Sequence, residues 1–485
     1  MSASSSGAPA HKSPTLPPEQ AADPTSRSDA TTWLIEKVAI ATVDAAGTEH
    51  ASGYLSVSGG RVAALGEGSP PDSALATADR RIDGSGCLLT PGLVNTHHHF
   101  YQWLTRGLVP DSDLFSWLTA LYPRWALLDA EMEHAAALGS LAALVRSGCT
   151  TTMDHHYVFP SDGGDLLAAE IEAASLIGVR FHPARGSMDL GRSAGGLPPD
   201  DVVEETEAAL EATEEAIARY HDPSPGSMCQ VAVAPCSPFS VSPELLMGAR
   251  ELARRHGVRL HTHLAETADE EAYCNQRFGC SPLEYVESLG WLGEDVWLAH
   301  GVHLAAKAIS ALAATRTGVA HCPSSNSRLG AGVAPLPELL AAGVPVGLGV
   351  DGSASNEAGE LGTELRSALL TARARKGPTA LSTRQALAIA TMGGALCLGR
   401  GDEIGSLEVG KLADLALWRL DTPAHVGIAD PVAALTLGSL PPLELLLVGG
   451  KAVVEAGELT SLGDEEIAAA VGRQAARLAR RAGLN

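Results

Sequence analysis

The middle of this chain, from about residue 88 to residue 408, alternates short apolar runs with helix-like stretches. Eight runs have the length and composition of buried strands, and helical segments separate them. The runs are residues 87–94, 149–155, 178–182, 230–234, 258–263, 296–300, 318–321 and 344–351. Eight strands that alternate with helices are typical of a (β/α)₈ barrel, so the sequence predicts an α/β fold of the TIM-barrel type.

Side chains able to bind a metal or move a proton stand where five of these runs end. They are His97 and His99, His261 and His263, His300, His321, and Asp351. A single histidine at a strand end is more often a structural residue. Because barrel enzymes carry their chemistry at the carboxyl ends of the strands, five such ends together predict one site at that rim.

The first of these ends is the most informative. An apolar run at 87–94 leads into three consecutive histidines, His97, His98 and His99. Residues two apart on a strand share a face, so His97 and His99 should converge while His98 points elsewhere. A surface cluster or an affinity tag is the alternative, but the internal position after a buried strand argues against it. Neutral imidazoles on a rigid element predict a metal site.

Both ends of the chain differ in pattern from the middle. Residues 1–30 are rich in Ser, Pro and Ala and predict a disordered tail. Short β-like runs at 33–42, 51–56 and 61–65 suggest an antiparallel sheet, and similar runs return at 413–417 and 445–456. The predicted divisions are a tail (1–30), a small β-sandwich module from both ends (31–87 and 409–460), the barrel (88–408) and a C-terminal helix (461–485).

Composition excludes several classes of partner. The net charge of −23 and the pI near 5.1 argue against nucleic acid or an anionic membrane surface as a partner. No apolar stretch reaches the roughly 18 residues of a membrane helix. Eight cysteines without a C-x-x-C pair fit reduced thiols in the cytoplasm. We therefore expect a cytoplasmic enzyme with a small-molecule substrate, and a homo-oligomer stays open.

Several motifs together resemble the amidohydrolase superfamily, in its mononuclear branch of aminohydrolases. They are residues 91–99, 263–266, 299–301, 349–356 and 405–414, within a resemblance that spans about residues 32–460. The resemblance implies that His97, His99, His263 and Asp351 bind the metal. It also implies that Glu266 shuttles protons and that His300 lies beside the reactive water.

Chemistry consistent with that resemblance follows from the residues themselves. A divalent ion held by imidazoles and a carboxylate lowers the pKa of its water towards about 7. Glu266 could then carry the water's proton to a ring nitrogen, assisted by Asp351, while the amine leaves as ammonia. A helix N-terminal carboxylate is the alternative for Glu266. The strand at 230–237 lacks the lysine that bridges two metals in binuclear relatives, and a buried thiol is expected for Cys236, so we expect one ion, zinc with iron as the alternative.

The loops after the strands suggest the substrate contacts. Gln102 could pair with a base edge, Trp117 could cover a flat ring, and Tyr157 and Arg185 follow the second and third strands. Helix packing is an equal alternative for the aromatics, and a structural ion pair for Arg185. These loops most resemble those of 8-oxoguanine deaminases, which implies conversion of 8-oxoguanine to urate and ammonia. Hydroxylated s-triazine aminohydrolases, guanine or pterin deaminases, C–N ring-opening hydrolases and a non-catalytic scaffold are the alternatives.

Overall fold

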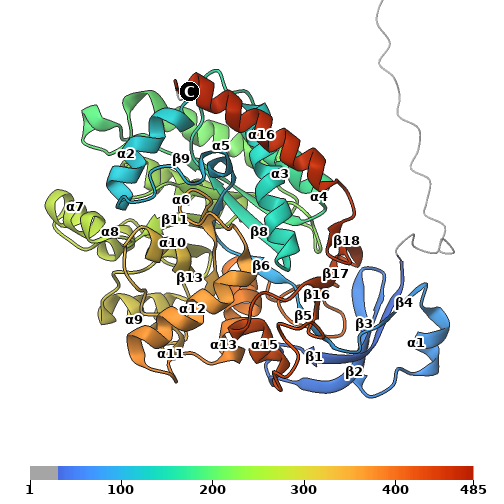
Figure 1. Cartoon of the computed structure of the whole chain (residues 1–485). Helices are drawn as coiled ribbons and strands as arrows, with labels where there is room; N and C mark the ends of the chain where they lie inside the picture. The colour runs from blue at the N-terminus through green and yellow to red at the C-terminus, as the bar shows by residue number, and fades with distance from the viewer. Residues whose placement is uncertain (1–30, 484–485) are drawn as a thin grey trace, which may run out of the picture.

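A closed barrel of eight parallel strands forms the centre of the computed structural model, which describes residues 31–483 (Figure 1). The strands are β6 (Leu93–Asn95), β8 (Cys149–His156), β9 (Arg180–Ser187), β10 (Ala232–Pro235), β11 (Leu260–Leu264), β12 (Val296–His300), β13 (Gly318–His321) and β14 (Val346–Leu348). Every residue of these strands is buried, as expected for a parallel sheet covered by helices. The predicted barrel is confirmed.

Helices cover the outside of the barrel. They are α2 (Leu114–Trp125), α3 (Ala130–Arg146), α4 (Leu166–Ile177), α5 (Thr206–Tyr220), α6 (Pro243–His256), α7 (Ala268–Phe278), α8 (Pro282–Ser288), α9 (Ala306–Thr315), α10 (Pro323–Arg328), α11 (Leu336–Ala341), α12 (Leu361–Lys376), α13 (Thr383–Ala388) and α14 (Gly394–Cys397). A short 3₁₀ helix, η1 (Phe100–Thr105), follows the three histidines. Side-chain caps fix several starts: Asp129 accepts from the amide of Met132 at α3, and Ser281 forms a capping box at α8.

A second sheet combines strands from both ends of the chain. It contains β1 (Trp33–Ala41), β2 (Glu49–Ser58), β3 (Arg61–Glu67), β4 (Arg80–Asp83), β5 (Cys87–Pro91), β16 (Leu415–Arg419), β17 (Leu443–Val448), β18 (Lys451–Glu455) and β19 (Glu458–Leu459). As predicted, β1, β2 and β3 are antiparallel, whereas β4 and β5 join β1 in parallel. Pairing of β5 with β16 connects the N-terminal strands to the C-terminal ones, which lie together beside the barrel (Figure 1).

The prediction of one strand over residues 87–94 is wrong. β5 belongs to the second sheet and β6 to the barrel, and Gly92 separates them. A Cβ atom on Gly92 would lie 2.2 Å from Cγ2 and Oγ1 of Thr150 in β8. Only glycine lets the backbone pass this close to the neighbouring strand, so the chain changes sheets here.

The last helix, α16 (Asp464–Arg481), lies within the predicted C-terminal segment 461–485 and packs along α3 (Figure 1). Ile467 and Leu478 on its apolar face are buried, and the guanidinium of Arg477 forms an ion pair with Asp129 at 2.6 Å. Two short helices remain: α1 (Asp72–Thr77) lies between β3 and β4 in sequence, and α15 (Pro431–Leu437) packs against α12 and α13. The predicted tail at residues 1–30 lies outside the described residues. Within residues 31–483, no helix has the length and apolar content to cross a bilayer.

Candidate metal centre and active site

The first and last strands of the barrel place three candidate metal-binding side chains together. Beyond the barrel rim, β7 (His98–His99) pairs with β15 (Asp351–Gly352). Oδ1 of Asp351 lies 3.4 Å from Nε2 of His97 and 3.3 Å from Nε2 of His99. His98 lies on the other face, where its Nδ1 accepts the amide of His99. The alternation expected from the sequence thus brings His97 and His99 to one point.

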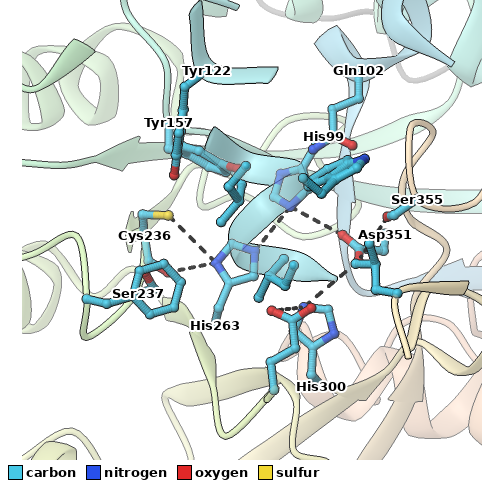
Figure 2. Close-up of a pocket in the computed structure, with 16 residues that line it drawn as sticks. His99, Gln102, Tyr122, Tyr157, Cys236, Ser237, His263, His300, Asp351 and Ser355 are labelled. Atoms are coloured by element: carbon cyan, nitrogen blue, oxygen red, sulfur yellow. Dashed lines mark hydrogen bonds and ion pairs between the residues drawn. The ribbon is translucent and has the colours of Figure 1, made fainter. Parts of the chain in front are cut away.

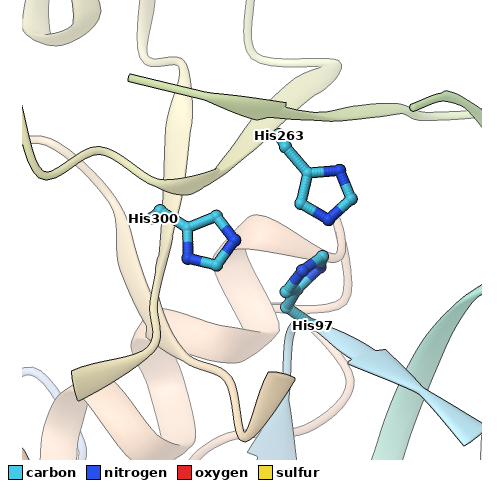
Figure 3. Close-up of side chains that lie close together, drawn as sticks. All are labelled: His97, His263 and His300. Atoms are coloured by element: carbon cyan, nitrogen blue, oxygen red, sulfur yellow. The ribbon is translucent and has the colours of Figure 1, made fainter. Parts of the chain in front are cut away.

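Two further histidines, His263 on β11 and His300 on β12, lie close to His97 and His99. Nε2 of His263 lies 3.1 Å from Nε2 of His99 (Figure 2). His97, His263 and His300 each offer a ring nitrogen within 4.8 Å of the others, and their rings point toward one another (Figure 3). Four histidines and Asp351 therefore surround one small volume at the carboxyl ends of the barrel strands.

Hydrogen bonds on the far side of each ring fix the histidine tautomers. Nδ1 of His99 donates to the carbonyl of His155 at 2.7 Å, and Nδ1 of His263 donates to the carbonyl of Cys236 at 2.7 Å. Each Nδ1 therefore carries a hydrogen, and each Nε2 presents a lone pair. Burial lowers the pKa of His263 well below its ordinary value, which keeps this ring neutral.

His97 obtains the same tautomer through a relay. Nδ1 of His261 donates to the carbonyl of Trp297 at 2.9 Å, so Nε2 of His261 must accept. It accepts from Nδ1 of His97 at 2.8 Å, which leaves Nε2 of His97 as a buried lone pair without a hydrogen-bond partner. Lone pairs of His97, His99 and His263 converge, and two of them 3.1 Å apart cannot bond to each other. A divalent cation fits this donor set.

Asp351 completes the set as an ionised carboxylate. Its Oδ2 accepts the Ser325 hydroxyl at 2.5 Å, and its Oδ1 accepts the amide of Gly352 at 2.7 Å. Both hydrogen bonds favour the ionised form, and the pKa of Asp351 lies well below its ordinary value although burial alone would raise it.

Glu266 lies beside the metal-binding side chains in the turn after β11. Burial, with a smaller contribution from the charge of Asp351, raises the pKa of Glu266 well above the ordinary value. Its Oε2 is 3.6 Å from Nε2 of His300, and the same nitrogen is 3.9 Å from Oδ2 of Asp351. Nδ1 of His300 donates to Oδ1 of Asn326 at 3.0 Å. Glu266, His300 and Asp351 therefore face one gap that a single water molecule can span.

A pocket lies beside these groups (Figure 2). Its lining residues are His99, Gln102, Leu114, Trp117, Leu118, Tyr122, Tyr157, Cys236, Ser237, Phe239, His263, Glu266, His300, Leu329, Asp351 and Ser355. Two buried polar atoms of this lining have no hydrogen-bond partner in the described chain, namely Oε1 of Gln102 and Nε1 of Trp117. Aromatic walls with a few unsatisfied polar atoms are typical of a site for a flat polar ring.

Arg185, which we expected at the substrate, does not line this pocket. Its guanidinium donates to both carboxylate oxygens of Glu204, at 2.8 and 2.6 Å, and its Cζ lies 4.0 Å from the ring centre of Phe159. A bidentate pair of this kind satisfies a buried guanidinium, so the geometry agrees with the alternative of a structural ion pair. His321 is buried at the end of β13 and is also absent from the lining.

The lining residues that follow β10 also bear on the number of metals. There is no lysine among the lining residues. Cys236 is there, with its Sγ 3.9 Å from Nδ1 of His263, but burial raises the pKa of this thiol to about 12. Burial therefore favours the neutral thiol, which agrees with the buried thiol expected for Cys236. His261 was predicted at the rim but without a role, and Ser325 was not predicted; they contact the candidate ligands His97 and Asp351, respectively.

Comparison with known proteins agrees with this arrangement. Residues 88–453 match the Amidohydrolase family. The chain is 47% identical to the 8-oxoguanine deaminase of Pseudomonas aeruginosa, over 92% of this chain and 98% of that protein. It is 40% identical to the hydroxydechloroatrazine ethylaminohydrolase of Pseudomonas sp. (strain ADP), over 80% and 82% of the two chains. The zinc complex of atrazine chlorohydrolase from Arthrobacter aurescens superposes with a TM-score of 0.86 at 34% identity, over 91% of this chain and 100% of that one. On its barrel, its converging histidines and these relatives, the chain belongs to the amidohydrolase family.

Proposed function

We propose that this enzyme removes the amino group of a heterocyclic base by metal-dependent hydrolysis, and that 8-oxoguanine is its preferred substrate. The products are urate and ammonia. The observation that carries the proposal is the convergence of three imidazole lone pairs and Asp351 beside the buried Glu266, at the floor of an aromatic pocket. The similarity to an 8-oxoguanine deaminase supports the choice of base.

One zinc ion is the expected cofactor, held by His97, His99, His263 and Asp351. A divalent ion at this position supplies Lewis acidity and lowers the pKa of water in the site to about 7. The zinc-bound relative supports the choice of metal.

Glu266 moves the protons of the reaction. It takes one from water, because its raised pKa suits a group that both accepts and releases protons near neutral pH. It passes this proton to the ring nitrogen next to the carbon that bears the amine. Asp351 receives the second proton of water and delivers it to the departing amine, which leaves as ammonia. His300 faces both carboxylates and orients the water between them.

Gln102 and Trp117 recognise the base. The amide of Gln102 pairs with the pyrimidine edge, and the indole N–H of Trp117 donates to an exocyclic carbonyl oxygen of the base. Tyr157 contributes to the wall of the pocket. Because Arg185 is held by Glu204, we assign the 8-oxo group to Trp117. A base without that oxygen leaves the buried indole N–H unpaired, which costs about 1–3 kcal/mol, so selectivity of roughly tenfold over guanine is expected.

The test compares 8-oxoguanine with guanine by ultraviolet absorbance, which separates urate from xanthine. Wild type should prefer 8-oxoguanine, and Trp117→Phe should lose most of this preference while its rate on guanine changes little. Equal rates of the wild type on both bases would contradict the proposal. Turnover of a hydroxylated aminotriazine, with neither purine consumed, would favour the second candidate, a triazine aminohydrolase, which the 40% identical relative supports.

We further infer that the enzyme acts in the cytoplasm. All eight cysteines lie among the described residues, and all are free thiols. Reduced thiols fit a reducing compartment.

A further inference from the structure

The turn that carries Glu266 is held by a second carboxylate, Glu270. Its Oε1 accepts the amide N–H of Ala265 at 2.9 Å, and its Oε2 accepts the amide N–H of Glu266 at 2.9 Å. Ala265 has a φ of +53°, in the left-handed region that a residue with a Cβ rarely adopts. A turn with this backbone needs external contacts to stay populated, and Glu270 supplies two of them.

These contacts differ from ordinary helix capping. Glu270 is the third residue of α7, whose N-cap is Thr267. In a capping box, a glutamate at this position accepts the amide N–H of the N-cap residue. Glu270 instead accepts the amides of the two residues before Thr267. Its carboxylate therefore holds the end of β11 and not only the start of α7.

Burial of the Glu270 carboxylate costs free energy, because the group leaves water without gaining a cationic partner among the described residues. Glu270 is 0% exposed, and within residues 31–483 no cationic side chain forms an ion pair with it. Burial raises the pKa of Glu270 to about 7, and the two amide hydrogen bonds oppose that rise. Both of its oxygens can accept only when the group is ionised, since a protonated acid would direct O–H at an N–H.

The carbonyl side of the same turn is attached to the strand that ends in His300. The amide of Gly301 donates to the carbonyl of Leu264 at 3.1 Å, and the amides of Val302 and His303 donate to the carbonyl of Ala265 at 2.9 Å. His300 itself has a φ of +74°. The turns that carry Glu266 and His300 are therefore tied together on one side, and Glu270 holds the other side.

From these contacts we propose that Glu270 is a positioning residue, which fixes the backbone of Ala265 and Glu266 and so sets the carboxylate of Glu266 against His300. The inference rests on the proposed function, because it requires Glu266 to carry protons. Glu270 touches neither the substrate pocket nor the metal-binding side chains. It acts only through the turn.

Glu270→Gln tests the proposal. The amide can accept one N–H, but its own NH₂ then faces the other. A displacement of Glu266 should lower kcat by up to about 10²-fold, with KM and bound metal near the wild-type values. Asp269→Asn is the matched control, since Asp269 is an exposed carboxylate in the same first turn of α7. It should leave kcat unchanged.

A double-mutant cycle separates positioning from general stability. In a Glu266→Gln background, adding Glu270→Gln should change kcat by less than about threefold, because the group being positioned is already gone. An undiminished loss in that background, or a loss of metal together with activity, would overturn the proposal. A normal kcat in the Glu270→Gln single variant would also overturn the proposal. If Glu270→Gln does not accumulate as folded protein, Glu270→Asp replaces it, since the shorter carboxylate reaches one amide, and an intermediate kcat is expected.

Hydrogen exchange gives a result independent of catalysis. The amides of Ala265 and Glu266 should exchange faster in Glu270→Gln than in wild type or Asp269→Asn, as measured by mass spectrometry on a peptide that spans them. Unchanged exchange of these two amides would contradict the positioning role of Glu270, even if the enzyme turns over no purine. Faster exchange, with no deaminase activity in the wild type, would instead support the hydrogen bonds from Glu270 to the turn and contradict the proposed function.

Discussion

At the scale of single residues, the state of each histidine depends on a partner far away in sequence. The alternation of side chains along a strand predicts that His97 and His99 converge, and they do. It cannot predict the tautomer of His97, which depends on His261, 164 positions later. Likewise, Arg185 stands at a strand end as expected, but its partner Glu204 comes from an irregular segment whose path no periodicity reveals.

The relay through His261 leads to a prediction about metal affinity. His261→Phe keeps the ring that stacks on Trp297, with centroids 4.4 Å apart, but removes the acceptor for Nδ1 of His97. Zinc affinity should fall by about 10–100-fold, as for other outer-sphere partners of metal-binding histidines. Competition with a chromogenic chelator measures it. His182→Phe, at a buried histidine of β9 that contacts no metal-binding side chain, is the control. Equal affinity in both variants would rule out the relay.

Glu266 should matter for turnover and not for metal retention. Glu266→Gln keeps the size and polarity of the side chain but cannot carry a proton, so kcat should fall roughly 10²–10⁴-fold. Metal content should stay at the wild-type level, because Glu266 lies outside the proposed donor set. Steady-state kinetics and elemental analysis on the same preparation decide it. Near-normal turnover in this variant would show that another group moves the proton.

At the scale of elements, apolar runs were enough to predict the barrel strands, because every strand is buried on both faces. The same uniform burial hid the change of sheet at Gly92, since β5 and β6 are both completely buried. Only the close approach of Gly92 to Thr150 explains why one strand ends and the next begins at this position. Composition thus locates strands but does not assign them to sheets.

Behind β8, an unusual cluster of buried acids connects that strand to α3 and α4. Asp154, His156, Glu133 and Glu170 are all 0% exposed. Nε2 of His156 donates to the carbonyl of Val158, and its Nδ1 lies 2.7 Å from Oε1 of Glu170, so one proton lies between these two groups. Burial raises the pKa of Glu133 well above its ordinary value and that of Glu170 to about 8. We expect the cluster to hold protons at neutral pH.

This cluster predicts how stability depends on pH. Its folded-state pKa values lie above the ordinary 4.5, so its contribution to stability is full below about pH 4.5 and is lost as pH rises through about 8. Glu133→Gln can donate a hydrogen bond without a titrating proton. Its unfolding free energy should therefore fall less between pH 5 and pH 8, by about 1 kcal/mol or more. Urea unfolding at each pH measures this, with the exposed Glu172→Gln in α4 as control. Parallel pH curves for the two variants would refute it.

At the scale of the whole molecule, the proposed metal-binding side chains come from distant parts of the barrel. His97 and His99 follow its first strand, His263 lies on β11, and Asp351 follows its last strand. We expect one equivalent of divalent metal per chain, by elemental analysis of protein purified without added metal. Removing it with a chelator should lower the thermal midpoint, because the ion binds only the folded arrangement, and zinc should restore it. Two equivalents in active protein would contradict a mononuclear site.

The sheet shared by both ends of the chain also determines when folding can finish during synthesis. Trp418 donates from its indole to Thr90, 328 positions earlier. At about 5–20 residues per second, a ribosome needs roughly 15 to 65 seconds to make the intervening segment. Throughout that time, the edge of β5 that pairs with β16 has no neighbouring strand, although every residue of β5 is buried in the folded protein. The second sheet therefore begins to emerge first but is completed last. We expect chaperones to bind the nascent chain at the unpaired edge of β5.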